Sequence, residues 1–255
     1  MNPLDTNMIY AVMWERLRKP WGRDYAGYTS SIFRSKDGGT TWEELETGLP
    51  FNNGDRGRIG LAMAASDPNV LYASFTKDPV TNDFSGLYKS IDGGDTWKKT
   101  NDFFLNGMYS TFGWYFGNLR VNPRDANEAY VLGVSLQRTQ SGGSSWNRIA
   151  DGVHVDHHAL EMHPTDSTLT VLGNDGGVYI SSDEGDSWKH LPNLPITQFY
   201  ECEVSQSEIN HYYGGTQDNG TVMTSDGQQE NWRNILGGDG FHVVVAPESS
   251  DIMYD

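Results

Sequence analysis

A short polar turn that ends in tryptophan occurs five times in this chain and constrains the fold more than any other feature. Its most regular copies read Ser35-Lys-Asp-Gly-Gly-Thr-Thr-Trp42 and Ser90-Ile-Asp-Gly-Gly-Asp-Thr-Trp97. The third position of the turn falls at residues 37, 92, 141, 183 and 226, so the copies recur every 42 to 55 residues. A repeat of that length with four short strands is the unit of a β-propeller. The sequence therefore predicts an all-β chain of four-stranded antiparallel blades.

The residues of the turn have a physical logic. An Asp carboxylate can accept backbone N–H groups across a tight loop, a leading Ser or Thr hydroxyl does so more weakly, and Gly supplies positive φ. The Trp adds a large apolar anchor. We call these segments the Asp turns, although Ser141 replaces the Asp in the third copy and the fifth copy has one extra residue. We predict a structural role for Asp37, Trp42, Asp92, Trp97, Trp146, Asp183, Trp188, Asp226 and Trp232.

The segments between the Asp turns read as strands, because runs of Val, Ile, Tyr and Leu are bounded by Gly, Pro, Asn and Asp. We expect residues 1–255 to form one propeller segment with units at 1–55, 56–105, 106–151, 152–194 and 195–237 and the start of another at 238–255. The first unit lacks an inner strand, whereas residues 241–246 supply one and residues 247–254 begin a further second strand. This duplication predicts an open arc of about five blades, cut from a larger array of roughly seven to ten blades or from a tandem propeller. The remaining blades would then be partners of this segment.

Composition excludes several classes of partner. The net charge of −16 argues against nucleic acid and against anionic membrane surfaces, because binding to either needs Lys and Arg. No apolar run approaches the length of a membrane span, and no signal peptide is visible at the N-terminus. The single cysteine, Cys202, cannot form an internal disulfide. No phosphate loop, dinucleotide fingerprint or cysteine metal motif is present, so we expect no cofactor.

A histidine-rich segment, His154-Val-Asp156-His157-His158, leads from an inter-blade loop into an inner strand. In extended backbone, His154, Asp156 and His158 would share one side. Nitrogen and carboxylate ligands suit zinc or another transition metal, whereas a polar cluster at a water-filled channel mouth and a direct ligand-binding or catalytic role are the alternatives. Our working hypothesis assigns these histidines to ligand binding and assigns no residue to a metal.

Three Gly-rich loops each carry an acidic residue, namely Asp175, Asp218 and Asp239. Asp-Gly and Asn-Gly favour tight turns, so a turn-forming role is one interpretation. In the other, the carboxylates face a central channel and hold substrate hydroxyls or a hard cation. Up-and-down strands place these loops, the His154 segment and His242 on the face opposite the Asp turns, and we expect them to converge there.

Aromatic residues crowd two loops on the same face. One loop spans residues 103–116 and includes the candidate ligand-binding residues Trp114 and Tyr115. The loop of the first unit adds Trp14, Trp21, Tyr25 and Tyr28. Exposed aromatic rings can stack on sugars, but such rings also fill the packing between blades, and the sequence leaves both interpretations open.

The Ser-x-Asp-x-Gly-x-Thr-Trp turn resembles the Asp-box, or BNR repeat, of sialidases, xyloglucanases and sortilin-type receptors. Longer phrases, including Val155-Asp-His-His-Ala-Leu160 and Gly214-Gly-Thr-Gln-Asp-Asn-Gly220, resemble large exported bacterial proteins with a sortilin N-terminal-like propeller, often labelled glycosyl hydrolases. The resemblance implies a secreted, periplasmic or envelope location. Xyloglucanases use two aspartates that face a cleft, and Asp156 resembles one of them in position.

Three functions follow from these features. The first is a noncatalytic or scaffold propeller that binds a glycan or a peptide on the face opposite the Asp turns. The alternative is part of a glycoside hydrolase with Asp156 and Asp218 as its carboxylate pair. The third is a purely structural array of blades.

Overall fold

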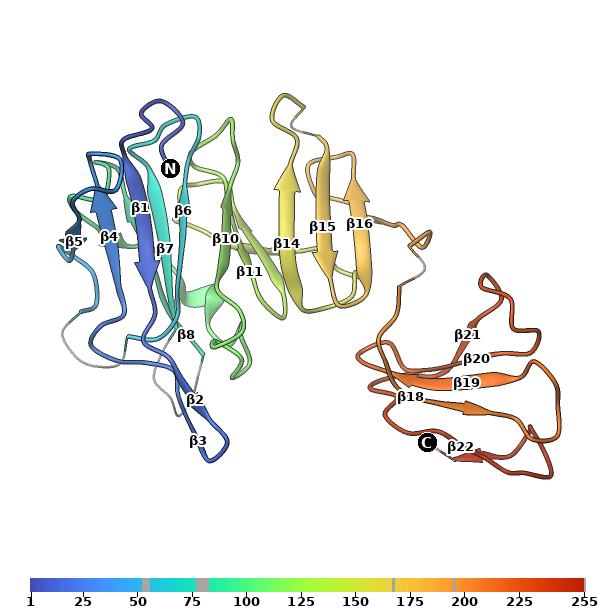
Figure 1. Cartoon of the computed structure of the whole chain (residues 1–255). Coiled ribbons are helices and arrows are strands. Elements are labelled where there is room, and N and C mark those ends of the chain that lie inside the picture. The colour runs from blue at the N-terminus through green and yellow to red at the C-terminus, as the bar shows by residue number, and fades with distance from the viewer. Residues whose placement is uncertain (52–55, 77–82, 167, 195, 255) are drawn as a thin grey trace. The chain divides into compact units, whose positions relative to one another are not determined.

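The structure is a computed structural model that describes residues 1–51, 56–76, 83–166, 168–194 and 196–254 (Figure 1). The described part is built from antiparallel β-sheets and contains one short 3-10 helix, η1 (Phe103–Leu105). The prediction of an all-β fold of four-stranded propeller blades is confirmed. The chain forms two compact units: unit 1 holds residues 1–174 and 179–190, and unit 2 holds residues 175–178 and 191–255.

The first sheet has the order β1-β4-β5, and the described part lacks a fourth strand for it. Four further sheets each follow chain order: β6-β7-β8-β9, β10-β11-β12-β13, β14-β15-β16-β17 and β18-β19-β20-β21. The strands through the second sheet are β1 (Ile9–Met13), β2 (Leu17–Lys19), β3 (Gly22–Asp24), β4 (Ser31–Ser35), β5 (Glu43–Leu45), β6 (Ile59–Met63), β7 (Leu71–Thr76), β8 (Phe84–Ser90) and β9 (Lys98–Lys99).

The later strands form three four-stranded sheets, each with one Asp turn, and a final two-stranded sheet, β22-β23. They are β10 (Asn118–Val121), β11 (Ala129–Leu132), β12 (Leu136–Thr139), β13 (Asn147–Ile149), β14 (His157–Met162), β15 (Thr170–Asn174), β16 (Gly177–Ser181), β17 (Lys189–His190), β18 (Phe199–Val204), β19 (Tyr212–Thr216), β20 (Thr221–Thr224), β21 (Arg233–Leu236), β22 (Val244–Val245) and β23 (Met253–Tyr254). No helix in this described part is long and apolar enough to cross a membrane.

The Asp turns are closed by their own side chains. In the fourth turn, the Ser181 hydroxyl and the Ser187 N–H each donate to Oδ1 of Asp183 at 2.8 Å, and the Ser187 hydroxyl donates to Oδ2 at 2.5 Å. Hydrogen bonds from Ser187 and then Ser181 lower the pKa of Asp183 to about 2, and equivalent bonds, led by the Thr41 hydroxyl, do the same for Asp37. These contacts support the structural interpretation of the turns.

The hydrophobic core of unit 1 lies between successive sheets. Its clusters contain Ile32, Leu45, Leu71 and Phe75 between the first and second sheets, Tyr72, Leu87, Leu119 and Val131 between the second and third, and Tyr130, Leu132, Leu160 and Leu172 between the third and fourth. The alternation of apolar and polar residues along each strand supplies these faces.

The tryptophans of the Asp turns pack in this space to different degrees. Trp97 and Trp146 are each 3% exposed, because each lies in a cluster shared by its own sheet and the preceding one. Trp188 is half-buried against the third cluster. Trp42 belongs to the first sheet and is 44% exposed. The anchor role predicted for these residues therefore depends on the neighbouring sheet.

Two arginines, the buried Arg34 and the half-buried Arg138, connect neighbouring sheets of unit 1. Arg34 is 4% exposed and donates to the carbonyl of Gly93 and to Asp95 Oδ1 in the second Asp turn, both at 2.6 Å. Arg138 makes the equivalent bonds to the fourth Asp turn at 2.7 and 3.1 Å. Both arginines directly precede the first residue of an Asp turn, so the repeat places the same connection at the same edge of two sheets.

In unit 2, the strand expected at residues 241–246 is shorter than predicted. It is reduced to β22, which pairs with β23. The loop before β22 instead binds to β19, because the Gly240 backbone N–H donates to the Thr216 carbonyl at 2.9 Å. Phe241, which follows, has φ +31° and so does not continue an extended strand. β1 pairs with β4 within unit 1, and the open arc of blades stays a prediction.

Candidate functional site

The β2–β3 hairpin of unit 1 forms one wall of a pocket at the end of the first sheet. β1 and β4 pair with Ile9 opposite Ser35 and Met13 opposite Ser31, so the first Asp turn lies at one end of this pair and the hairpin leaves from the other. Figure 1 shows the hairpin extending from that end. The pocket has a volume of about 540 Å³ and is lined by Lys19, Pro20, Trp21, Gly22, Arg23, Tyr25 and Trp114.

A row of stacked aromatic rings borders this pocket. Tyr25 stacks on Trp114 with ring centroids 5.6 Å apart and planes 13° apart, and Trp14 also stacks on Tyr25, with centroids 6.3 Å apart. The row continues from Trp114 to Tyr115 at 5.5 Å and from Tyr115 to His158 at 4.9 Å. Two loops far apart in the sequence therefore supply one aromatic surface.

Guanidinium groups lie against the same rings. Arg16 lies 5.0 Å from the Trp14 ring centroid and 5.9 Å from that of Tyr25, which is cation–π geometry. Arg58 lies 5.8 Å from the Trp14 ring and donates to the carbonyls of Trp114 and Tyr115. Burial lowers the pKa of Arg58, and the nearby charge of Arg16 acts in the same direction. The arginines hold the aromatic row and give it positive charge.

The His154 segment enters unit 1 beside the far end of this row. Asp156 is half-buried at φ +64°, a conformation that Asp adopts more readily than most residues. His157 is 3% exposed, and its backbone N–H donates to the Gly133 carbonyl at 2.8 Å. Its ring Nδ1 has no hydrogen-bond partner among the described residues. Burial, followed by the charge of His158, lowers the pKa of His157 to about 4. His157 is therefore neutral at physiological pH.

The metal alternative gains no support from this segment. Within the described ranges, no group of three or more His, Cys, Asp or Glu residues has the geometry to hold a metal ion. His154 directs Nδ1 toward the Val155 carbonyl at 3.1 Å, and the His158 ring stacks on Phe116 at 5.5 Å. These rings take part in local packing.

Unit 2 brings two of its candidate aspartates together. The Asp218 N–H donates to Asp239 Oδ1 at 2.9 Å, and Asp218 has φ +61°. Tyr200 stacks on Phe241 at 4.9 Å, and partial burial followed by the charges of Asp239 and Asp218 raises its pKa. The contacts form a small acidic and aromatic cluster.

The other candidates of unit 2 lie around this cluster. The Asn219 side chain donates to the Asp175 carbonyl at 2.8 Å. His242 forms an ion pair with Glu201 through Nδ1. The two residues proposed as a catalytic pair, Asp156 and Asp218, belong to unit 1 and unit 2 respectively. Their convergence, and that of the His154 segment with Asp175, Asp239 and His242, stays a prediction.

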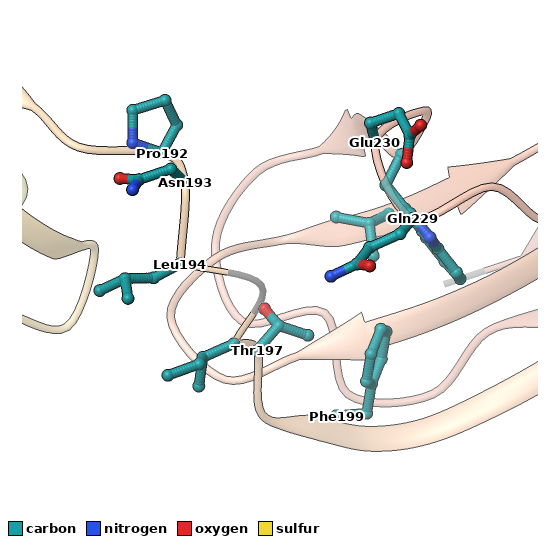
Figure 2. Close-up of a pocket in the computed structure, with 10 residues that line it drawn as sticks. Pro192, Asn193, Leu194, Thr197, Phe199, Gln229 and Glu230 are labelled. Carbon is teal, nitrogen blue, oxygen red and sulfur yellow. The ribbon is translucent and has the colours of Figure 1, made fainter.

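A second pocket, in unit 2, has a volume of about 550 Å³. Figure 2 shows Pro192, Asn193 and Leu194 along one side and Gln229 and Glu230 on the other. The remaining lining is largely apolar: Ile196, Thr197, Phe199, Val222 and Trp232. This lining resembles the faces on which the sheets of unit 1 pack, and we assign it no ligand.

Several residues in and beside the aromatic pocket were not among our candidate site residues. Trp21 and Tyr25, which line the pocket, and Trp14, which stacks on Tyr25, were recognised only as members of an aromatic-rich loop. The roles of Lys19 and Arg23 were not predicted. The available signal is the local composition, because the segment Arg16-Leu-Arg-Lys-Pro-Trp-Gly-Arg23 carries four cations in an acidic chain.

Comparison with known proteins points to xyloglucanases. No protein-family model matches the chain. The xyloglucanase Xgh74A of Acetivibrio thermocellus is 27% identical over 213 residues, which cover 74% of this chain and 24% of that protein. The xyloglucanase of Hypocrea jecorina is 24% identical over 100% of this chain and 27% of its own length. The chain thus spans about a quarter of the length of these relatives.

A solved structure agrees with the fold. The GH74 xyloglucanase from Xanthomonas campestris matches with a TM-score of 0.55 and 15% identity, over 99% of this chain and 40% of that one. At this identity the match concerns the fold alone. The chain is a set of β-propeller blades whose sequence and fold are similar to parts of xyloglucanases.

Proposed function

We propose that this segment binds a glycan in the pocket between the β2–β3 hairpin and Trp114. The observation that carries the proposal is the pocket itself, which is lined by Trp21, Tyr25 and Trp114. Trp21 is 82% exposed, so its ring face is available to a sugar ring. Aromatic rings beside a few polar groups are typical of small-ligand sites. The similarity to xyloglucanases supports a glycan rather than a peptide.

The same proposal includes a location. The segment would act outside the cell or in the envelope, as its resemblance to large exported proteins implies. The segment would present its aromatic pocket there as part of a longer protein, with the remaining blades as its partners.

The test uses the 255-residue chain and a soluble xyloglucan oligosaccharide, with binding measured by isothermal titration calorimetry. We expect Trp21→Ala and Trp114→Ala each to weaken binding about tenfold or more, the usual effect of removing an aromatic anchor. Trp21 is largely exposed, so Trp21→Ala should leave the melting temperature unchanged. Phe104→Ala is the matched control, because Phe104 is 64% exposed and lies outside the pocket. An equal loss of affinity in this control, or no effect of either Trp variant, would contradict the proposal.

A second candidate function is glycoside hydrolysis by the longer protein. It is favoured by the xyloglucanase relatives and by the positive φ angles of Asp156 and Asp218, since unusual backbone conformations concentrate at active sites. It requires the two carboxylates to lie about 5 Å apart for a retaining mechanism or about 6.5–9.5 Å apart for an inverting one. Hydrolysis of xyloglucan that is lost in Asp156→Asn and in Asp218→Asn, with folding intact, would support it. Full activity in both variants would exclude this pair.

A further inference from the structure

The hairpin that walls the proposed pocket has an unusual charge distribution. The whole chain has 18 Lys and Arg against 34 Asp and Glu, yet β2, β3 and their connection contain Arg18, Lys19 and Arg23, and Arg16 directly precedes them. Two of the residues that line the pocket, Lys19 and Arg23, are cations, and none of its lining residues is acidic. The pocket is therefore positive in a strongly acidic protein.

The register of the hairpin places like charges opposite each other. Arg18 pairs with Arg23 across the two strands. Like charges in directly opposed positions destabilise a sheet, so a ligand that neutralises them would remove this cost. Lys19 lies one residue nearer the turn, opposite Gly22, with its Nζ 5.8 Å from the Trp21 ring.

The acidic residues near the hairpin do not neutralise this charge. Glu15 accepts the N–H and the hydroxyl of Thr29, at 2.9 and 2.8 Å, and the backbone bond is the main reason why its pKa is lowered. Asp24 follows Arg23 on β3, so its side chain points to the face of the hairpin opposite that of Arg18 and Arg23, a face that it shares with Lys19. Within the described residues, no ion pair holds Arg18, Lys19 or Arg23.

We infer that the pocket selects a sugar that carries a carboxylate, that is, a uronic acid residue of an acidic glycan. This inference rests on the proposed function and adds the charge of the ligand. The Arg23 guanidinium, whose Nη1 lies 3.4 Å from the Tyr25 hydroxyl, presents a planar donor pair that matches a carboxylate, and Lys19 adds a point charge at the hairpin tip. Trp21 and Trp114 supply ring faces for the sugar.

The test compares two probes on the 255-residue chain, an oligogalacturonate and a neutral xyloglucan oligosaccharide, at low and at physiological salt. We expect the acidic probe to bind about tenfold more tightly at low salt and this preference to shrink as salt screens the charges. Arg23→Gln and Lys19→Gln should each remove most of the preference for the acidic probe, because each takes one positive charge out of the pocket. Lys98→Gln, an exposed cation on β9 outside the pocket, changes the net charge equally and should have no effect.

The outcomes separate this inference from the proposed function. Equal binding of the two probes by the unmodified chain would overturn the inference and leave glycan binding intact. Binding of neither probe would overturn both. Poly-glutamate that binds through Arg23, with no binding of oligogalacturonate, would also overturn the inference and would identify an acidic peptide as the ligand.

Discussion

At the Asp-turn end of unit 1 the charged side chains are held by partners within the fold, whereas at the hairpin end the cations of β2 and β3 have no ion-pair partner among the described residues. Asp183 uses both carboxylate oxygens within its own turn, and Arg34 is bonded to the neighbouring turn. Arg18 and Arg23 instead face each other across a hairpin. Polar groups whose bonds are satisfied locally serve the fold, whereas the unbalanced charge beside the exposed Trp21 is the basis of our proposed ligand site.

The largest loss of stability should come from replacing the tryptophans of the Asp turns, and its size should depend on how far the neighbouring sheet buries each ring. Trp97→Ala should lower the free energy of unfolding by about 3–5 kcal/mol, because it leaves a cavity among buried side chains. Trp188→Ala should cost less, and Trp42→Ala least, since Trp42 is 44% exposed. Urea denaturation measures all three. An equal loss of unfolding free energy in Trp42→Ala and Trp97→Ala would show that the ring stabilises its own turn and not the packing between sheets.

The next effect concerns the connection made by Arg34. Arg34→Ala should lower the free energy of unfolding by about 1–3 kcal/mol, since it removes the charged donor to the Gly93 carbonyl and to Asp95. Lys36→Ala is the matched control, because Lys36 contacts Glu43, another partner of Arg34, at 2.9 Å but is exposed. Thermal unfolding of the two variants compares them, and a larger loss for Lys36→Ala would contradict the role of Arg34.

A smaller, pH-dependent effect should come from Asp183. Its pKa falls from 3.8 to about 2 in the folded chain, mainly through the Ser187 hydroxyl. A group with a lowered folded pKa stabilises above its unfolded pKa and loses that contribution as pH falls through the folded value. The melting temperatures of the unmodified chain and of Asp183→Asn should therefore differ most above about pH 4 and approach each other toward about pH 2. A difference that does not change with pH would contradict the ionised turn.

The smallest effect should follow from completing the third turn. The Ser141 hydroxyl already lies 3.0 Å from the N–H and from the hydroxyl of Ser145, where the other turns place a carboxylate. Ser141→Asp should raise stability by about 0.5–1 kcal/mol, because the charged acceptor strengthens the same bonds. Circular dichroism melting measures this gain, and a loss of stability would show that the third turn has diverged from its repeat.

The repeat made most strands predictable. The predicted four strands per repeat match the sheets β6-β7-β8-β9, β10-β11-β12-β13, β14-β15-β16-β17 and β18-β19-β20-β21. Local turn chemistry and strand pattern are both encoded within one unit, so they can be deduced without tertiary information. Residues 241–246 were harder, because Gly240 bonds to Thr216 of the preceding sheet and shortens the strand.

The pocket could be predicted only in part. The aromatic loops were recognised, but the stacking of Tyr25 on Trp114 joins two segments of different blades and depends on the tertiary fold. The β2–β3 hairpin lay within an expected loop, because each of its strands has only three residues and reads as mostly polar. The opposition of Arg18 and Arg23 follows from its register, which the sequence alone does not give.

The most direct test of the contrast between the hairpin end and the Asp-turn end of unit 1 compares one variant from each end. Affinity for oligogalacturonate and melting temperature are measured for Arg23→Gln and for Asp183→Asn, at a temperature where both variants are folded. Our account predicts that Arg23→Gln loses affinity about tenfold with an unchanged melting temperature, whereas Asp183→Asn melts lower with unchanged affinity. Loss of affinity in Asp183→Asn, with full binding in Arg23→Gln, would contradict the assignment of ligand binding to the hairpin end.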